Sequence, residues 1–211
     1  AQTNPTIAPY AGSGEVRLRI TAKAANESEA LRLIEPVERQ LLERLGPYFY
    51  GYGDEGLEIV VARLLLAQKK TVAVAESCTG GLISHKLTNV AGSSGYYMQG
   101  AVTYSNAAKT AVLGVEPELL TRFGAVSKQV AKAMAEGVRK WAGTDIGLSV
   151  TGIAGPGGGS AAKPVGLVYF GISYPQDTKV FRRQFAGDRL QVKERAALAA
   201  LDILRRYLLG N

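Results

Sequence analysis

The alternation of apolar and polar residues predicts a small element near the start of the chain. Residues 15–24 predict a half-exposed strand, because apolar side chains at 16, 18 and 20 alternate with arginines at 17 and 19. Residues 31–45 carry apolar side chains at helical spacing. Residues 48–52 predict a second strand, so residues 15–53 are expected to form a β-α-β element. Residues 1–14, rich in Pro, Gly, Ser and Thr, predict a linker or arm.

From residue 54 onward, short apolar runs alternate with amphipathic segments. The expected strands are 71–75, 98–104 and 146–150, followed by a hairpin of 165–174 and 179–185. The expected helices are 57–68, 82–89, 109–113, 116–123, 127–141 and 190–209. Helices that alternate with strands favour a three-layer α/β/α domain with a mixed sheet over residues 54–211.

The composition of the chain excludes several classes of protein and of site. The chain has 211 residues, of which 46% are hydrophobic, and no apolar run approaches the length of a membrane span. The N-terminus lacks the features of a signal peptide, and the cytoplasm is the expected location. The chain does not begin with Met, which suggests an excised domain or a processed chain. One histidine and one cysteine are too few for a structural zinc site, and no metal or cofactor is expected.

The net charge of +7 is unevenly distributed. Residues 1–53 carry six basic and six acidic side chains, whereas residues 54–211 carry 19 basic and 12 acidic ones. Such an excess fits ordinary solubility charge or a site for a phosphorylated small molecule. Nucleic acid is a weaker alternative, because no basic run with interleaved aromatics is present.

The sequence ESCTGG at residues 76–81 joins a buried strand to a helix. Such a turn surrounds a nucleophile-sized side chain with free backbone N–H groups, an arrangement that suits an anion or oxyanion. Ligands of α/β proteins gather at the carboxyl ends of strands, so the reactive residues of this and similar loops are candidates for one site. They are Ser77, Cys78, Tyr104, Ser105, Lys109, Thr151, Lys163 and Arg189.

The residue types favour lysine over histidine as a general base. His85 follows Ser77 by eight residues in one helix, a separation of about 12 Å that excludes a nucleophile–base hydrogen bond. A desolvated lysine loses its proton more readily, and Lys109 is the first choice. Ser105, four residues before Lys109, remains an alternative nucleophile. Cys78 lacks a histidine partner and is expected to face the core.

One further spacing resembles a catalytic motif. Ser160 and Lys163 match the S-x-x-K pattern of penicillin-binding enzymes, which requires a helix. Here the pattern lies between a triple glycine and Pro164, which favours a chance match.

Seven motifs, in order, closely resemble the C-terminal domain of the CinA (competence- and damage-inducible) family, also called PncC. They are AESCTGG, AGSSGYY, GAVTYSNAAK, GAVS, TGIAGPGGG, KPVG and AGDR, within residues 55–209. The element at 15–53 resembles the KH-like connector of full-length CinA proteins. The family's N-terminal molybdopterin-binding-like domain is absent from this chain and would be its partner.

The resemblance implies nicotinamide-nucleotide amidase activity, in which nicotinamide mononucleotide (NMN) and water give nicotinic acid mononucleotide and ammonia. The family's serine and lysine correspond to Ser77 and Lys109, with Tyr104 as a further catalytic residue. Backbone N–H groups near Thr79 to Gly81 are expected to hold the oxyanion. The expected substrate-binding residues are Thr79, Gly80, Gly81, Thr151, Gly152, Lys163 and Arg189.

Two other classes of function remain open from the sequence. A non-catalytic nucleotide-binding or regulatory module would use residues 15–53 as a docking arm. A nucleic-acid-binding role for those residues is disfavoured by their zero net charge and the absence of a G-x-x-G loop. Family resemblance implies a homodimer or larger assembly.

Overall fold

The computed structural model describes residues 4–12 and 14–210. The chain divides into two compact units, Ala1–Tyr52 and Gly53–Asn211. Among the described residues, no helix is both long and apolar enough to span a membrane.

The first unit is a β-hairpin followed by a helix. Strand β1 (Thr6–Ala11) pairs antiparallel with β2 (Val16–Thr21), and helix α1 (Glu27–Leu45) follows. A short 3-10 helix, η1 (Gly46–Tyr48), ends the helical segment. The Asn26 side chain caps α1 by accepting from the Glu29 amide at 2.9 Å.

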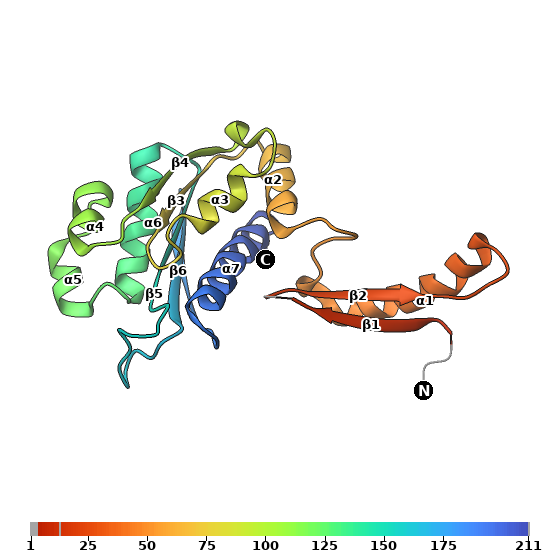
Figure 1. Cartoon of the computed structure of the whole chain (residues 1–211). Helices are drawn as coiled ribbons and strands as arrows, with labels where there is room; N and C mark the ends of the chain where they lie inside the picture. Colours follow the sequence, from red (N-terminus) through yellow and green to blue (C-terminus); the bar gives the residue numbers. More distant parts are fainter. Residues whose placement is uncertain (1–3, 13, 211) are drawn as a thin grey trace. The chain divides into compact units, whose positions relative to one another are not determined.

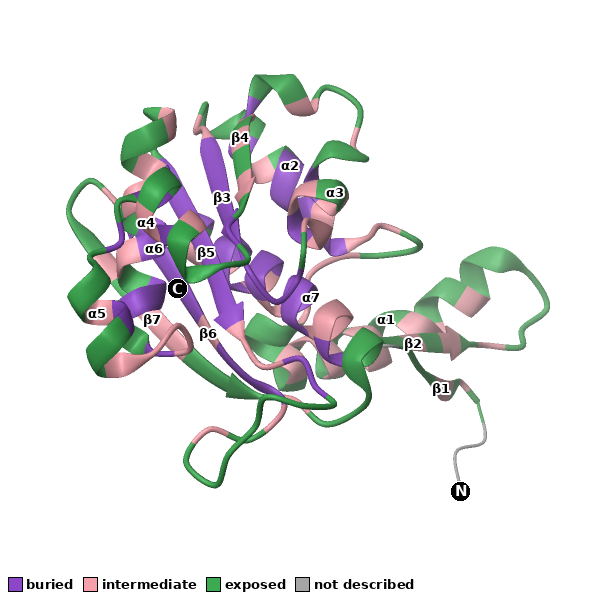
Figure 2. Ribbon diagram, turned by 60° about the vertical axis from the view of Figure 1, so that its left-hand side comes forward, coloured by how far each residue is buried: buried purple, intermediate pink, exposed green. Residues whose placement is uncertain are grey.

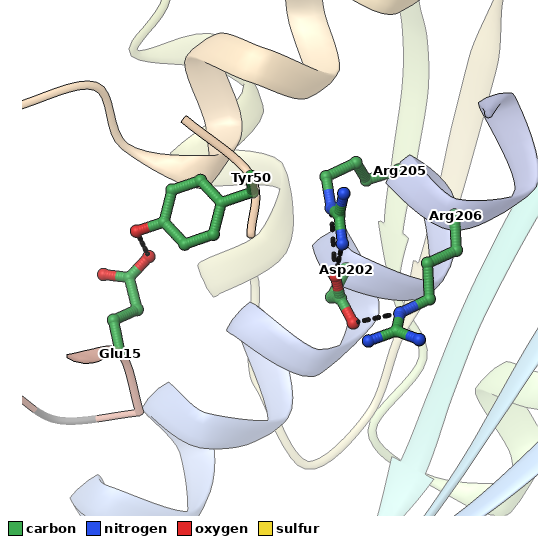
Figure 3. Close-up of polar contacts among 5 residues, drawn as sticks. All are labelled: Glu15, Tyr50, Asp202, Arg205 and Arg206. Carbon is green, nitrogen blue, oxygen red and sulfur yellow. Dashed lines mark hydrogen bonds and ion pairs between the residues drawn. The ribbon is translucent and has the colours of Figure 1, made fainter. Parts of the chain in front are cut away.

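The sequence prediction for this unit was wrong in its order. The element is β-β-α rather than β-α-β, and residues 49–52 form no strand. Residues 6–11 were predicted to be part of an arm, but pairing with β2 makes them a strand, a tertiary effect that the local pattern does not reveal. Residues 1–3 and 13 of the predicted arm lie outside the described residues. Tyr50 joins the segment after α1 to the hairpin, since its hydroxyl donates to Glu15 at 2.7 Å (Figure 3).

The second unit is built on a sheet that runs through its middle (Figure 1). The sheet has five strands in the order β4-β3-β5-β6-β7. Strand β3 (Val72–Glu76) pairs in parallel with β4 (Tyr97–Val102) and with β5 (Ile146–Gly152). Strands β6 (Leu167–Tyr174) and β7 (Asp177–Gln184) extend the sheet antiparallel from β5. The predicted mixed sheet is therefore confirmed.

Helices cover both faces of this sheet (Figure 1). One layer contains α2 (Leu57–Ala67), α3 (Leu82–Thr88) and α7 (Arg189–Leu208). The other contains α4 (Asn106–Leu113), α5 (Pro117–Phe123) and α6 (Lys128–Ala142). The predicted three layers are confirmed.

Burial explains why β3 lies in the centre. All five of its residues are buried, as Figure 2 shows in purple, which fits a strand covered on both faces. Ala73 and Ala75 face α6, where Val130, Met134 and Val138 complete one core cluster. Each large apolar side chain buried there contributes about 1.5–3 kcal/mol of transfer free energy. The core thus fixes the strand whose end carries the ESCTGG turn.

Helix α7 carries an internal ion-pair cluster near its C-terminal end. The Asp202 carboxylate accepts from Arg205 and from Arg206, each at 2.7 Å (Figure 3). Arg205 is buried, so its charge requires such a partner.

Candidate active site

The ESCTGG turn begins where β3 leaves the sheet. The Ser77 amide continues the pairing with β5 by donating to the Val150 carbonyl at 3.1 Å, and the Gly80 amide closes the turn onto the Ser77 carbonyl at 3.1 Å. Gly80 and Gly81 have φ values of 65° and 99°, a region that side chains disfavour. The glycines therefore allow the chain to reverse into α3 directly after Ser77.

Glu76, which was not among the residues predicted for the site, organises this turn. Its fully buried carboxylate accepts from the Thr79 hydroxyl at 2.6 Å and the Gly81 amide at 2.9 Å. It also accepts from the Ile83 amide at 3.2 Å and from the Ser84 amide and hydroxyl at 2.8 and 2.7 Å. An acidic residue that ends an otherwise apolar strand was the signal, because buried carboxylates require such partners.

Lys109 reaches Ser77 from the first turn of α4, the helix that follows the neighbouring strand β4. The Thr103 amide donates to the Glu76 carbonyl at 2.8 Å, which extends the β3–β4 pairing and brings the two loops together. The Lys109 Nζ donates to the Thr103 carbonyl at 2.7 Å, the Ser77 Oγ at 3.2 Å and the Tyr104 carbonyl at 3.3 Å. Ser77 and Lys109 are 8% and 1% exposed, so this pair is shielded from bulk water.

The surroundings of Lys109 shift its protonation equilibrium toward the neutral amine. Burial lowers the pKa of the Lys109 amine, and the three acceptors that it contacts are two carbonyls and a hydroxyl rather than carboxylates. A neutral amine accepts a proton, so the same contact can run in reverse, with the Ser77 hydroxyl donating to Nζ. The geometry thus suits proton transfer from Ser77 to Lys109.

The alternative nucleophiles are placed differently. The Ser105 Oγ accepts from the Ala108 amide at 3.1 Å, and Ser105 is the N-cap of α4. Cys78 is 6% exposed, and burial raises the pKa of its thiol to about 12. His85 is exposed on α3, where its Nε2 lies 3.1 Å from the Asn89 side chain.

Arg189 and Tyr104 form a polar pair beside Lys109. Asp188 caps α7 by accepting from the Gln191 amide at 2.9 Å, and this cap starts the helix at Arg189. The Arg189 guanidinium donates to the Tyr104 hydroxyl and to the Gly155 carbonyl, both at 2.8 Å. Tyr104 is 59% exposed and Arg189 is exposed as well, so this cation lies on the solvent side of the loop between β4 and α4.

The end of β5 and the glycine loop that follows it are held to the segment before α6, and the residues predicted as the start of that loop, Thr151 and Gly152, belong to β5. The Thr151 hydroxyl donates to the Ala125 carbonyl at 2.9 Å, and the Lys163 Nζ donates to the Phe123 carbonyl at 2.6 Å. Gly152 lies against β6, where a Cβ would come within 2.7 Å of the Val168 side chain. Ser160 and Lys163 share a turn rather than a helix, so the S-x-x-K spacing lacks its structural context.

Fewer backbone N–H groups near Ser77 are available for an oxyanion than the sequence predicted for residues 79–81. The Gly80 amide is bonded to the Ser77 carbonyl and the Gly81 amide to Glu76. The Thr79 amide makes no hydrogen bond within residues 4–12 and 14–210. Of these three amides, Thr79 is therefore the one free to bind an oxyanion. Across the same described ranges, no three His, Cys, Asp or Glu side chains gather as metal ligands.

Comparison with protein families identifies both parts of the chain. Residues 54–208 match the family model of the CinA C-terminal domain, and residues 1–51 match that of the KH domain of damage-inducible protein CinA.

Curated relatives are similar over nearly the whole chain. A CinA-like protein of Kosmotoga olearia is 55% identical over 208 residues, and a putative competence-damage inducible protein of Clostridium acetobutylicum is 52% identical over 209. Each alignment covers 99% of this chain but only 50% and 51% of the relative. The chain therefore spans about half the length of these relatives.

Solved structures agree with the fold of the second unit. A CinA superfamily protein from Klebsiella pneumoniae has a TM-score of 0.71 at 35% identity, over 74% of this chain and 97% of that one. A CinA superfamily protein from Escherichia coli has a TM-score of 0.68 at 30% identity, over 76% of this chain and 97% of that one. Sequence, fold and family models agree, and the chain belongs to the CinA family.

Proposed function

We propose that the second unit is an amidase that converts NMN and water to nicotinic acid mononucleotide and ammonia. The observation that supports this proposal most directly is the contact between the Lys109 amine and the Ser77 hydroxyl at 3.2 Å. A buried serine beside a lysine of lowered pKa is an activated nucleophile for acyl transfer.

The reaction proceeds through an acyl-serine. Neutral Lys109 takes the proton of the Ser77 hydroxyl as Oγ attacks the carboxamide carbon, which gives a tetrahedral oxyanion. The C–N bond then breaks, and the proton that Lys109 took, transferred directly or relayed through the Tyr104 hydroxyl, leaves with the nitrogen as ammonia, so that the Lys109 amine is neutral again. Water attacks the acyl carbon with Lys109 again as base, and release of the acid restores Ser77.

The other groups bind the substrate and the developing charge. The Thr79 amide donates to the oxyanion, because the Gly80 and Gly81 amides are used within the turn. Arg189 binds the phosphate, since its guanidinium suits that geometry. Lys163 is a second candidate, because its bond to Phe123 uses one of three N–H donors.

A trapped intermediate tests this proposal. Enzyme quenched during turnover of NMN is digested and analysed by mass spectrometry. A nicotinoyl group on Ser77 in the peptide of residues 71–86 is expected. An adduct on Ser105 instead would reassign the nucleophile, and ammonia release without an adduct on any residue would favour direct attack by water.

We infer that the amidase works in the cytoplasm as part of a longer, dimeric protein. The matched relatives are about twice as long as this chain, and the additional length is enough for the molybdopterin-binding-like domain. If the purified chain releases no ammonia from NMN but binds it, the regulatory-module alternative is favoured instead.

A further inference from the structure

A second lysine stands at the ESCTGG turn without a role in the reaction described above. A Cβ built on Gly80 would lie 3.5 Å from the Nζ of Lys193, so this amine approaches the turn from α7. Cys78, between Ser77 and the glycines, experiences the positive charge of both Lys109 and Lys193. The two lysines therefore reach the nucleophile turn from α4 and α7, helices of opposite layers.

The ammonium group of Lys193 has no partner in the part of the chain that the structure describes. The charged residues next to Lys193 in sequence do have partners. Glu194, the nearest acid in sequence, pairs with Lys86 at 2.7 Å, and Arg195 donates to the Ala186 carbonyl. Lys193 is half-buried, so its charge loses part of its hydration without a protein anion to replace it.

Lys193 shares a helix face with Arg189. The two residues are four apart in α7, which places their Cβ atoms about 5–6 Å from each other. The Arg189 guanidinium is held by the Tyr104 hydroxyl and the Gly155 carbonyl, neither of which neutralises it. Two uncompensated cations one helical turn apart suit a dianionic group better than a neutral one.

Two other roles for Lys193 fit less well. It is not the general base, because Lys109 holds the contact with Ser77. Nor does its charge set the protonation of Lys109, whose lowered pKa results from burial. The remaining role for a cation at the edge of the turn is to bind the part of the substrate that extends away from the amide.

We propose that Lys193, together with Arg189, binds the phosphate of the substrate and makes the site specific for phosphorylated amides. This inference rests on the proposed amidase function. It adds Lys193 as a specificity-determining residue of that site.

The test compares a phosphorylated with an unphosphorylated amide. Lys193→Met keeps the length of the side chain and removes its charge. On NMN we expect kcat/KM to fall about 10- to 100-fold, mainly through KM, the loss typical of a hydrogen bond to a charged group. On nicotinamide riboside, which has the same amide without the phosphate, the variant should match the wild type. Lys193→Arg should recover most of the activity on NMN.

Lys132→Met is the matched control, since it removes the same charge from an exposed lysine of α6 that pairs with Glu136 at 3.8 Å. It should behave as the wild type on both substrates. Equal losses for Lys193→Met on NMN and nicotinamide riboside would overturn the proposal, because the charge would then act at the amide. An unchanged KM for NMN would also overturn it.

A binding measurement separates this inference from the amidase function. Ribose 5-phosphate carries the phosphate without the amide, and calorimetric titration should show about tenfold weaker binding to Lys193→Met than to the wild type or Lys132→Met. If the wild type binds ribose 5-phosphate but does not hydrolyse NMN, the amidase proposal fails and the phosphate site stands. Equal binding to all three proteins, or to none, contradicts the phosphate site.

Discussion

The amine of Lys109 lies 3.2 Å from the hydroxyl oxygen of Ser77, although 32 residues separate them in sequence. The pairing of two parallel strands brings them together, since Ser77 follows β3 and Lys109 follows β4. Their contact depends on the sheet rather than on a flexible loop, which is how a reactive pair is held in productive geometry.

Removal of either member of this pair should abolish amide hydrolysis. Ser77→Ala and Lys109→Met are each expected to lower kcat on NMN by at least about 1,000-fold, because each change removes the activated nucleophile. The double variant should be no worse than either single variant, since the two groups act as one unit. Ammonia release measures the loss, and additive losses would show that the residues act separately.

Ser105→Ala is the matched serine variant. Because the Ser105 hydroxyl caps α4, its loss should cost about 1 kcal/mol of unfolding free energy and leave most of the activity. Urea denaturation and ammonia release check the two effects. Loss of activity in Ser105→Ala with retention in Ser77→Ala would move the nucleophile to Ser105.

The activity should increase with pH through the lowered pKa of Lys109. The base form is neutral, and burial lowers the pKa of this amine, so the neutral fraction grows at a lower pH than for a free lysine. We expect kcat/KM on NMN to rise with pH and to level off below the usual lysine value of about 10.4. A pH–rate profile measures this, and a midpoint at the ordinary lysine value would contradict a desolvated base.

Cys78 should be inert despite its position beside the nucleophile. With the pKa of its thiol raised to about 12, the thiolate fraction at pH 8 is only about one in ten thousand. Iodoacetamide should therefore leave the native protein unmodified at pH 8 and label Cys78 fully in 6 M guanidinium. Rapid labelling of the native protein, with loss of activity, would instead support a thiolate nucleophile.

The strands and helices of the larger unit could be predicted from its sequence, because their apolar residues recur with a strong period. The apolar run before ESCTGG predicts a strand covered on both faces, and β3 is one. The order within the first unit could not be predicted in this way. Residues 6–11 lack strict alternation, and their strand exists only through its partner.

Some residues of the candidate site could likewise be predicted from the sequence, and others could not. Ser77 and Lys109 could be proposed from the sequence, because lysine was the base left once His85 was excluded. The contacts of Glu76 and Lys193 depend on which groups the fold brings near the turn. Neither residue belongs to a local sequence pattern from which its partner could be predicted. The bonds from Lys163 and Thr151 to the segment before α6 likewise join parts of the chain that are far apart in sequence.

Tyr104 should affect binding through Arg189. Tyr104→Phe removes the hydroxyl that accepts from the guanidinium at 2.8 Å and keeps the ring. Because the bond from Arg189 to the Gly155 carbonyl remains, we expect a severalfold increase in KM for NMN with a smaller change in kcat. A loss confined to kcat would instead assign the hydroxyl to proton transfer to the leaving ammonia.

Glu76 should support both the stability of the domain and the position of Ser77. Glu76→Gln replaces an acceptor of five hydrogen bonds with an amide whose NH2 group faces backbone donors. Buried donors left without an acceptor cost about 1–3 kcal/mol each, so we expect a loss of several kcal/mol of unfolding free energy in urea. Glu118→Gln, at an exposed position of α5, is the control and should change stability by less than about 0.5 kcal/mol. If Glu76→Gln is as stable and as active as this control, the carboxylate does not hold the nucleophile turn.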